Sequence, residues 1–126
     1  RWRPMLNLPP SVRIFISTVP ADMRRSFDGL AAMTERILER DPFSGHLFVF
    51  RNKRGDRVKI LYWDRSGYCL WYKRLEEGTF RFPERPAKSV EVEASELALL
   101  LEGFDLAGVR RAKRYARGAE KVGVEA

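Results

Sequence analysis

Residues 46–83 read HLFVFRNKRGDRVKILYWDRSGYCLWYKRLEEGTFRFP, and this stretch decides the predicted fold. Over 46–51, 57–63, 68–74 and 79–82 its apolar and polar residues alternate with the period of two that a β-strand shows. The three connections place Gly55, Gly67 and Gly78 late in each link, where a left-handed residue is wanted. The stretch therefore predicts an antiparallel meander of four strands.

The residues before this stretch predict a strand followed by a helix. Val12 to Ile16 is a short β-rich run after two prolines, bounded by a turn over 17–20. A helix over 22–39 follows, with Asp22 in its first turn and Pro42 beyond its end. Its apolar residues recur at helical spacing: Met23, Phe27, Leu30, Ala31, Thr34 and Leu38.

The residues after the stretch predict an edge strand and a shorter helix. Ser89 to Glu93 alternates valine with polar residues. Leu97, Leu100 and Leu101 form the stripe of a helix over 95–102, and Gly103 ends it. We therefore expect an α+β fold, an antiparallel β-meander of four to five strands with both helices covering one face. Residues 1–104 form a single domain in this prediction, and 105–126 form a basic tail or short helix.

Composition limits the class of protein. The chain has 126 residues, of which 44% are hydrophobic and 12% aromatic, so it has enough apolar surface to fold. Its net charge of +7 is typical of proteins that meet polyanions, although a solvated basic surface gives the same balance. Cys69 is the single cysteine, so a reducing compartment fits, and the chain lacks a long apolar run. We expect a cytoplasmic protein.

The charge is concentrated in the stretch that decides the fold. Between Arg51 and Arg81 there are nine lysines and arginines against four acids. Cations beside aromatic rings on a sheet are a common way to hold single-stranded nucleic acid. The alternative is that these aromatic residues pack into the core of their own sheet. The aromatic residues concerned are Tyr62, Trp63, Tyr68, Trp71, Tyr72 and Phe80.

Candidate DNA contacts follow from the predicted loops and strand edges. Lys53 and Arg54 lie in the first hairpin loop, from which they reach a phosphate backbone without disturbing the core. A helix over 109–117 would carry further cations on one side, unless this tail is merely solvated. The predicted DNA-binding residues are Arg51, Lys53, Arg54, Arg57, Lys59, Arg65, Arg110, Lys113 and Arg114.

The sequence offers little for catalysis. His46 is the only histidine, and at the start of a strand it is predicted to be a hydrogen-bonded structural residue. Cys69 lies within an apolar strand, where a thiol is buried and inert. Asp56 and Asp64 fall in predicted turns, which favour aspartate for backbone reasons. We therefore expect no catalytic residue, metal ligand or cofactor. A metal-dependent nuclease would need at least two carboxylates and a third ligand to converge in the fold.

Several longer segments carry a family resemblance. They are Leu8–Phe15 (LPPSVRIF), Asp22–Leu30 (DMRRSFDGL), Asp41–Asn52 (DPFSGHLFVFRN), Lys59–Asp64 (KILYWD), Leu70–Glu76 (LWYKRLE) and Gly78–Pro83 (GTFRFP). With them the chain, over roughly 5–103, resembles the TnpB accessory protein of the IS sixty-six family of insertion sequences. It does not resemble the much longer RNA-guided nuclease of the same name.

The resemblance implies a role in transposition beside a separate DDE transposase encoded by the same element. It implies no catalytic residues. We therefore expect a non-catalytic accessory protein that binds DNA, such as the element ends, with the transposase as a second partner. The alternative is a module that docks on the transposase without touching DNA, using anchors such as Trp63 or Trp71.

Overall fold

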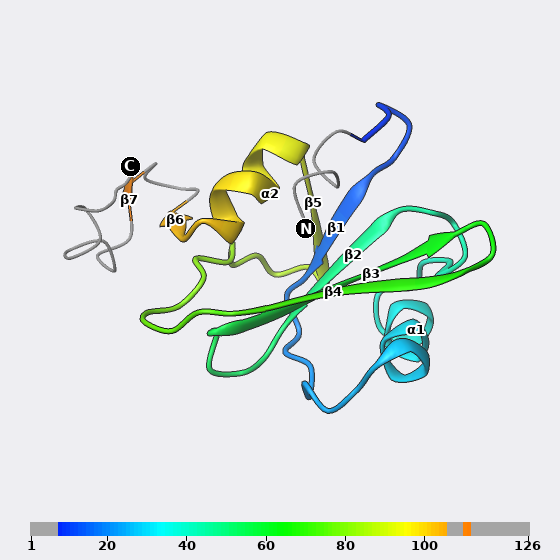
Figure 1. Ribbon diagram of the computed structural model, residues 1–126, viewed down its shortest axis with the longest axis horizontal. Coiled ribbons are helices and arrows are strands. Elements are labelled where there is room, and N and C mark those ends of the chain that lie inside the picture. Colours follow the sequence, from blue (N-terminus) through cyan, green and yellow to red (C-terminus); the bar gives the residue numbers. More distant parts are fainter. Residues whose placement is uncertain (1–7, 106–109, 112–126) are drawn as a thin grey trace.

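The computed structural model describes residues 8–105 and 110–111, and its centre is a five-stranded sheet (Figure 1). The strands are β1 (Ile14–Ser17), β2 (Leu47–Arg51), β3 (Arg57–Asp64), β4 (Gly67–Arg74) and β5 (Ser89–Val92). They lie in the order β4-β3-β2-β1-β5, so β4 and β5 are the edges. The predicted α+β class is confirmed.

The pairing within the sheet is mixed. β2, β3 and β4 form the antiparallel meander that the sequence predicts. β1 runs parallel to β2, because the connection between them crosses over through helix α1 (Phe27–Arg36). β5 pairs antiparallel with the other side of β1, which confirms it as an edge strand.

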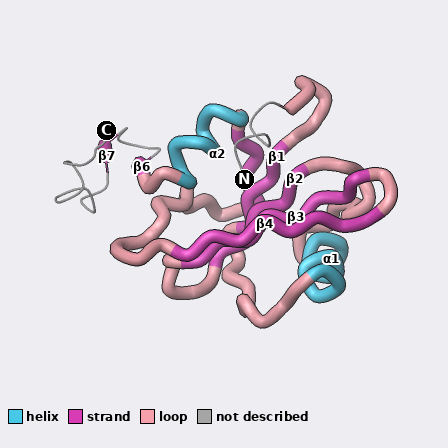
Figure 2. The backbone as a smooth tube through the Cα atoms, viewed as in Figure 1, coloured by secondary structure: helices cyan, strands magenta, loops and turns pink. Residues whose placement is uncertain are grey.

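The predicted strand over 79–82 is wrong. This segment belongs to the long connection between β4 and β5, which Figure 2 draws as loop. Phe80 explains the difference, because its side chain is buried in the core and its amide donates to the Gly55 carbonyl at 2.8 Å. The segment thus leaves the sheet edge to cover the core, and the meander stops at three strands.

The two helices lie on opposite faces of the sheet, not on one face as predicted (Figure 1). α2 (Ala94–Leu101) packs on the face that carries Ile14, Val49 and Ile60, whereas α1 packs on the face that carries Phe15 and Phe48. Alternate residues of one strand point to opposite faces. Residues 47–50 of β2 are all apolar and do not alternate as predicted for 46–51. Such unbroken apolar runs in β1 and β2 indicate a sheet covered on both sides, as their burial confirms.

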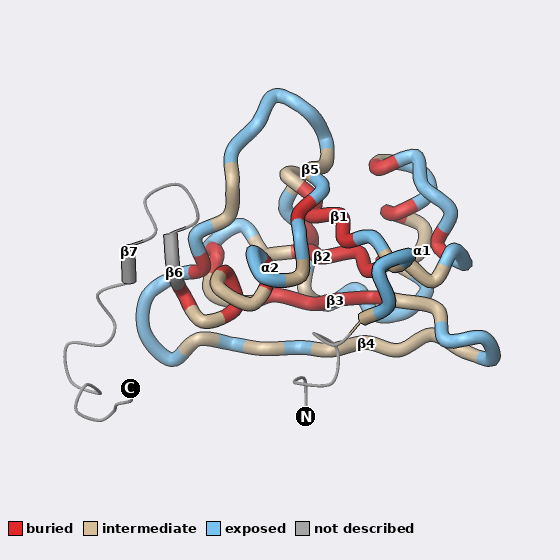
Figure 3. Tube along the Cα trace, turned by 90° about the horizontal axis from the view of Figure 1, so that it is seen from above, coloured by how far each residue is buried: buried red, intermediate tan, exposed pale blue. Residues whose placement is uncertain are grey.

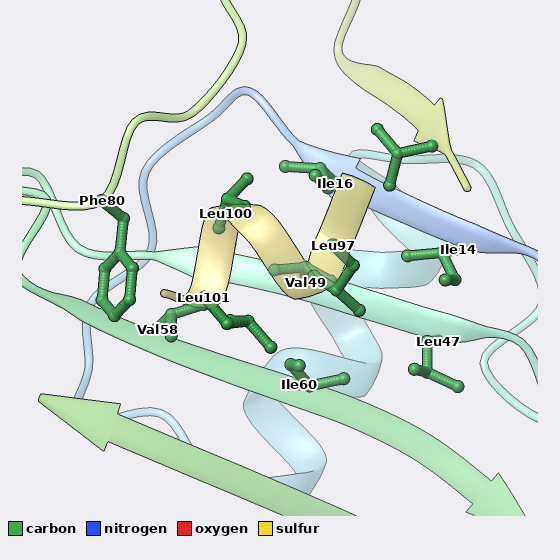
Figure 4. Close-up of a cluster of buried hydrophobic side chains, with 11 residues drawn as sticks. Ile14, Ile16, Leu47, Val49, Val58, Ile60, Phe80, Leu97, Leu100 and Leu101 are labelled. Atoms are coloured by element: carbon green, nitrogen blue, oxygen red, sulfur yellow. The ribbon is translucent and has the colours of Figure 1, made fainter. Parts of the chain in front are cut away.

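The α2 face holds the larger core cluster (Figure 4). Leu97, Leu100 and Leu101 of the helix are fully buried against Val49 and Ile60. Replacing one of these leucines with alanine would cost about 2–5 kcal/mol of stability, because the packed surroundings relax little around a cavity.

α1 is shorter than the predicted helix over 22–39. Asp22 accepts hydrogen bonds from the amide and the guanidinium of Arg24, which closes a turn before the helix and lowers the pKa of Asp22 to about 2. The helix begins at Phe27 after the N-cap Ser26, and it ends before Glu39, whose φ of +57° is left-handed. Competition from local side-chain bonds thus removes the first predicted turn.

The last described residues form two short strands, β6 (Phe104–Asp105) and β7 (Arg110–Arg111), which pair antiparallel. Arg110 and Arg111 are therefore extended and not part of the helix predicted over 109–117. The other residues of that prediction lie outside the described part of the chain. Among the residues that the structure describes, each helix falls short of the length and apolar content that crossing a bilayer requires.

Candidate nucleic-acid interface

The side chain of Asn52 fixes the shape of the loop between β2 and β3, together with backbone bonds inside the loop. Asn52 Oδ1 accepts bonds from the amides of Gly55 at 2.9 Å and Arg57 at 3.0 Å, and Asn52 Nδ2 donates to Asp56 at 2.7 Å. Gly55 has a φ of +86°, as the glycine pattern predicts. The loop is thus an ordered turn that presents Lys53 and Arg54 to solvent.

The carboxyl group of Asp56 favours the cations at the tip of this loop. The hydrogen bond from Asn52 lowers the pKa of the Asp56 carboxyl, and Arg54 and Arg57 act in the same direction. Asp56 faces Arg54 at 3.9 Å, a loose pair in which the arginine side chain is 83% exposed. Such a pair contributes little and leaves the guanidinium available to a ligand.

Arg57 and Arg74 lie directly opposite each other on β3 and β4. Like charges at opposed positions destabilise a sheet, so partners are needed. Arg57 Nη1 donates to the Tyr72 hydroxyl at 3.0 Å, and Arg74 Nη2 donates to Glu76 at 3.2 Å. These four residues line a pocket beside the loop. The pocket combines two guanidinium groups with a tyrosine ring that is 47% exposed.

The segment that follows β4 is hydrogen-bonded to the loop between β2 and β3. The amide of Leu75 donates to the Asp56 carbonyl, and that of Phe80 donates to Gly55, each at 2.8 Å. Arg81 is the next residue after Phe80, and it is exposed. We refer to Lys53, Arg54, Arg57, Arg74 and Arg81 together as the basic end of the sheet. A phosphate backbone is the ligand that such a set of cations suits.

Other predicted contacts are used inside the fold. Lys59 is only 6% exposed, and its ammonium group donates to the carbonyls of Met23 and Arg25, each at 2.8 Å. Lys59 thus holds the segment before α1 against the sheet and is not a surface contact. Arg51 is half-buried and donates to the carbonyls of Asn52 and Thr18 at 3.2 and 3.4 Å.

Arg65 is exposed but lies at the other end of the sheet. It sits in the β3–β4 turn, whereas the basic end lies at the start of β3, roughly 25 Å away for a strand of this length. Arg65 takes the left-handed conformation, with a φ of +52°, in place of Gly67. The reason is the turn length, because Gly67 already pairs with Asp64 and only Arg65 and Ser66 make the turn.

The side chains of the predicted contacts in the tail lie outside the described residues. Arg110 lies in β7, and its side chain, like Lys113 and Arg114, is outside the described residues. Of the nine predicted contacts, the structure brings Lys53, Arg54 and Arg57 together.

Sequence reasoning did not select Arg74, Tyr72 and Arg81. Arg74 joins the site only through its register with Arg57, and Arg81 only through the bond at Phe80. The alternating pattern of 68–74 gave a usable signal for Tyr72, because it places Tyr72 and Arg74 on one face.

An aromatic cluster occupies the opposite end of the sheet. Phe43, Trp63 and Tyr68 are in mutual contact, with ring centroids 5.0 to 5.6 Å apart. Phe43 is 58% exposed, while the other two rings are half-buried. Trp71, by contrast, packs against the core on the α2 face.

The residues with potential for catalysis are placed apart. His46 Nδ1 accepts a bond from the Arg13 amide at 2.9 Å, which confirms the predicted structural role. Burial and the nearby Arg13 and Arg40 lower its pKa. Within the described ranges, His, Cys, Asp and Glu residues form no group of three that is able to hold a metal ion.

Comparison with known proteins gives a family. Residues 12–111 match the family described as "IS66 Orf2 like protein". The chain is 40% identical over 107 residues to the uncharacterized protein y4jC of Sinorhizobium fredii, covering 85% of this chain and 92% of that protein. It is 37% identical over 101 residues to y4hO of the same organism, covering 80% and 88%. No solved structure matches the chain.

Proposed function

Because the chain belongs to the IS66 Orf2-like family of transposition accessory proteins, we propose that it assists transposition by binding DNA through the basic end. The observation that carries the proposal is that Lys53, Arg54, Arg57, Arg74 and Arg81 belong to three segments whose backbones are joined at one end of the sheet. Phosphate contacts from such residues supply affinity that is independent of base sequence. The protein contributes no chemistry in this proposal, and bond breakage belongs to the transposase.

The pocket suggests how a strand would be held. Arg57 and Arg74 flank the exposed ring of Tyr72, so a phosphate between the guanidinium groups would bring a neighbouring base within reach of the ring. Stacking on an aromatic ring requires an unpaired base, whereas phosphate contacts do not. Preference for single-stranded over duplex DNA therefore measures the contribution of Tyr72.

Fluorescence anisotropy with the full chain tests the proposal. The probes are an element-end duplex, a random duplex and a single strand, each with and without the transposase. We expect binding to all three without the transposase, with an affinity that falls steeply as salt rises. Absence of binding to every probe without the transposase would contradict direct DNA binding.

One observation favours a second function, docking on the transposase. The cluster of Phe43, Trp63 and Tyr68 exposes an aromatic surface about one strand length from the basic end. Aromatic residues dominate the energy of many protein interfaces. The two functions use different ends of the sheet, so variants at each end separate them.

A further inference from the structure

β4 forms an edge of the sheet that is long and regular. In Figure 3 it runs along the outside, and within the described chain it has a neighbouring strand only on its β3 side. All eight of its residues are in register with β3, without a bulge or a proline. The other edge, β5, has four residues. Soluble proteins usually shorten, bend or charge an edge strand, because a flat edge pairs with another strand. β4 lacks most of these protections.

The hydrogen-bonding pattern shows which backbone groups face outward. Residues of an antiparallel strand alternately exchange bonds with the neighbour and point their N–H and C=O away from it. The bond from the Leu75 amide to the Asp56 carbonyl fixes this alternation, since it puts odd-numbered residues of β4 on the bonded side. The outward groups therefore belong to Tyr68, Leu70, Tyr72 and Arg74.

We propose that β4 pairs antiparallel with β4 of a second copy of this chain, about a twofold axis at Trp71. In this register Tyr68 lies opposite Arg74 of the second copy, and Leu70 lies opposite its Tyr72. All four outward residues then exchange backbone bonds, two for each opposed pair. Centring the axis on Leu70 would leave Arg74 beyond the end of the partner strand.

Side-chain chemistry supports a second copy as the occupant. The twofold places each Arg74 guanidinium beside a tyrosine ring and keeps the two arginines apart. Leu70 meets Tyr72, a favourable aliphatic and aromatic pair, and Lys73 meets Cys69. Like charges therefore never face each other, although the strand carries two cations. An isologous contact also forms twice, which doubles the effect of each favourable pair.

The assembly joins two sheets edge to edge. Because the axis is perpendicular to the sheet, the α1 faces of both copies lie on the same side. The two basic ends then lie at opposite ends of the joint, on one continuous surface. The inference rests on the geometry of β4 alone and stands whether or not the protein binds DNA.

Light scattering coupled to size exclusion tests it on the full chain. We expect a mass near twice 14.7 kDa, decreasing towards 14.7 kDa on dilution. Leu70→Pro should shift the protein to monomer, because it removes an outward N–H without breaking a bond to β3. Leu70→Val is the matched control and should remain dimeric. Monomeric wild-type protein at all concentrations would overturn the proposal.

A cross-link tests the register and does not depend on the proline variant folding. Lys73→Cys places a thiol opposite Cys69 of the second copy, at a non-bonded pair whose Cα separation of about 4.5 Å allows a disulfide. Within one chain the two thiols lie four residues apart along a strand, too far to bridge. We expect covalent dimers on mild oxidation for this variant only. Lys53→Cys, an exposed control, should stay monomeric on a denaturing gel. Equal cross-linking of both variants, or none in Lys73→Cys, would refute the register.

Discussion

The ammonium group of Lys59 donates a hydrogen bond to the backbone carbonyl of Met23 at 2.8 Å, although the two residues come from different layers of the fold. A second bond reaches Arg25, and the lysine is 6% exposed. We predict that Lys59→Met lowers the free energy of unfolding by about 2–3 kcal/mol, because it leaves two carbonyls without their charged donor. Urea unfolding measures the loss. Lys53→Met at the exposed loop is the control, expected within about 0.5 kcal/mol of wild type.

Removing two cations from the loop tests the proposed phosphate contacts. Lys53→Ala with Arg54→Ala should weaken DNA binding about equally for all sequences and flatten the slope of log affinity against log salt by up to roughly two units. Arg36→Ala with Arg40→Ala removes the same charge from the last residue of α1 and from the segment after it, and should leave the slope nearly unchanged. Equal effects of both pairs would point to net charge in place of a site.

Arg74 distinguishes a functional arginine from a structural one. Since Arg74 faces Arg57 across the strands, its replacement by glutamine relieves a like-charge contact and should change stability by less than about 0.5 kcal/mol. The same variant should reduce the salt slope of DNA binding by about one unit. A large loss of stability with unchanged DNA affinity would assign Arg74 to the fold.

The cluster of Phe43, Trp63 and Tyr68 is the proposed surface for docking on the transposase. Phe43→Ala should reduce binding to the transposase, measured by calorimetry, because Phe43 is the exposed ring of its cluster. Binding to DNA should remain unchanged, since Phe43 carries no charge and is not part of the basic end that makes the proposed phosphate contacts. Phe27→Ala, which removes another exposed ring, is the control.

The lowered pKa of His46 predicts that the stability of the fold depends on pH. Burial and nearby arginines lower its pKa in the folded protein, so the neutral ring is the form that accepts from Arg13. In the unfolded chain the histidine binds a proton more readily, with a pKa of about 6.5. The stability that the neutral His46 ring contributes is therefore present above that pH and is lost as pH falls. Urea unfolding between about pH 8 and about pH 5 should show the loss. His46→Asn keeps an acceptor that does not titrate and should flatten the dependence.

Much of the fold was accessible from periodicity. The alternation in 57–63 and 68–74 placed the central hairpin, and the valines at 90 and 92 identified the edge strand. The segment over 79–82 was wrongly predicted to be a strand, because its alternation has a different cause. Phe80 and Phe82 face the core from a loop, and a period of two does not reveal whether a neighbouring strand is present to pair with the segment.

The candidate site was less accessible. Lys53 and Arg54 were found because a polar loop with glycine has a characteristic sequence. Lys59 was misassigned because a lysine in a strand has the same local pattern whether its face meets solvent or a helix. The placement of the segment before α1, which supplies the carbonyls of Met23 and Arg25, decides between them.

The sequence by itself determined three strands of the meander, the cationic loop at its tip and the family to which the chain belongs. These follow from local chemistry, since strand period and turn residues act over a few neighbours. The tertiary structure decided which face each helix covers, the opposition of Arg57 and Arg74, and the burial of Lys59. Each of these depends on contacts between segments far apart in the chain, whose geometry is set when the sheet pairs and both of its faces are covered.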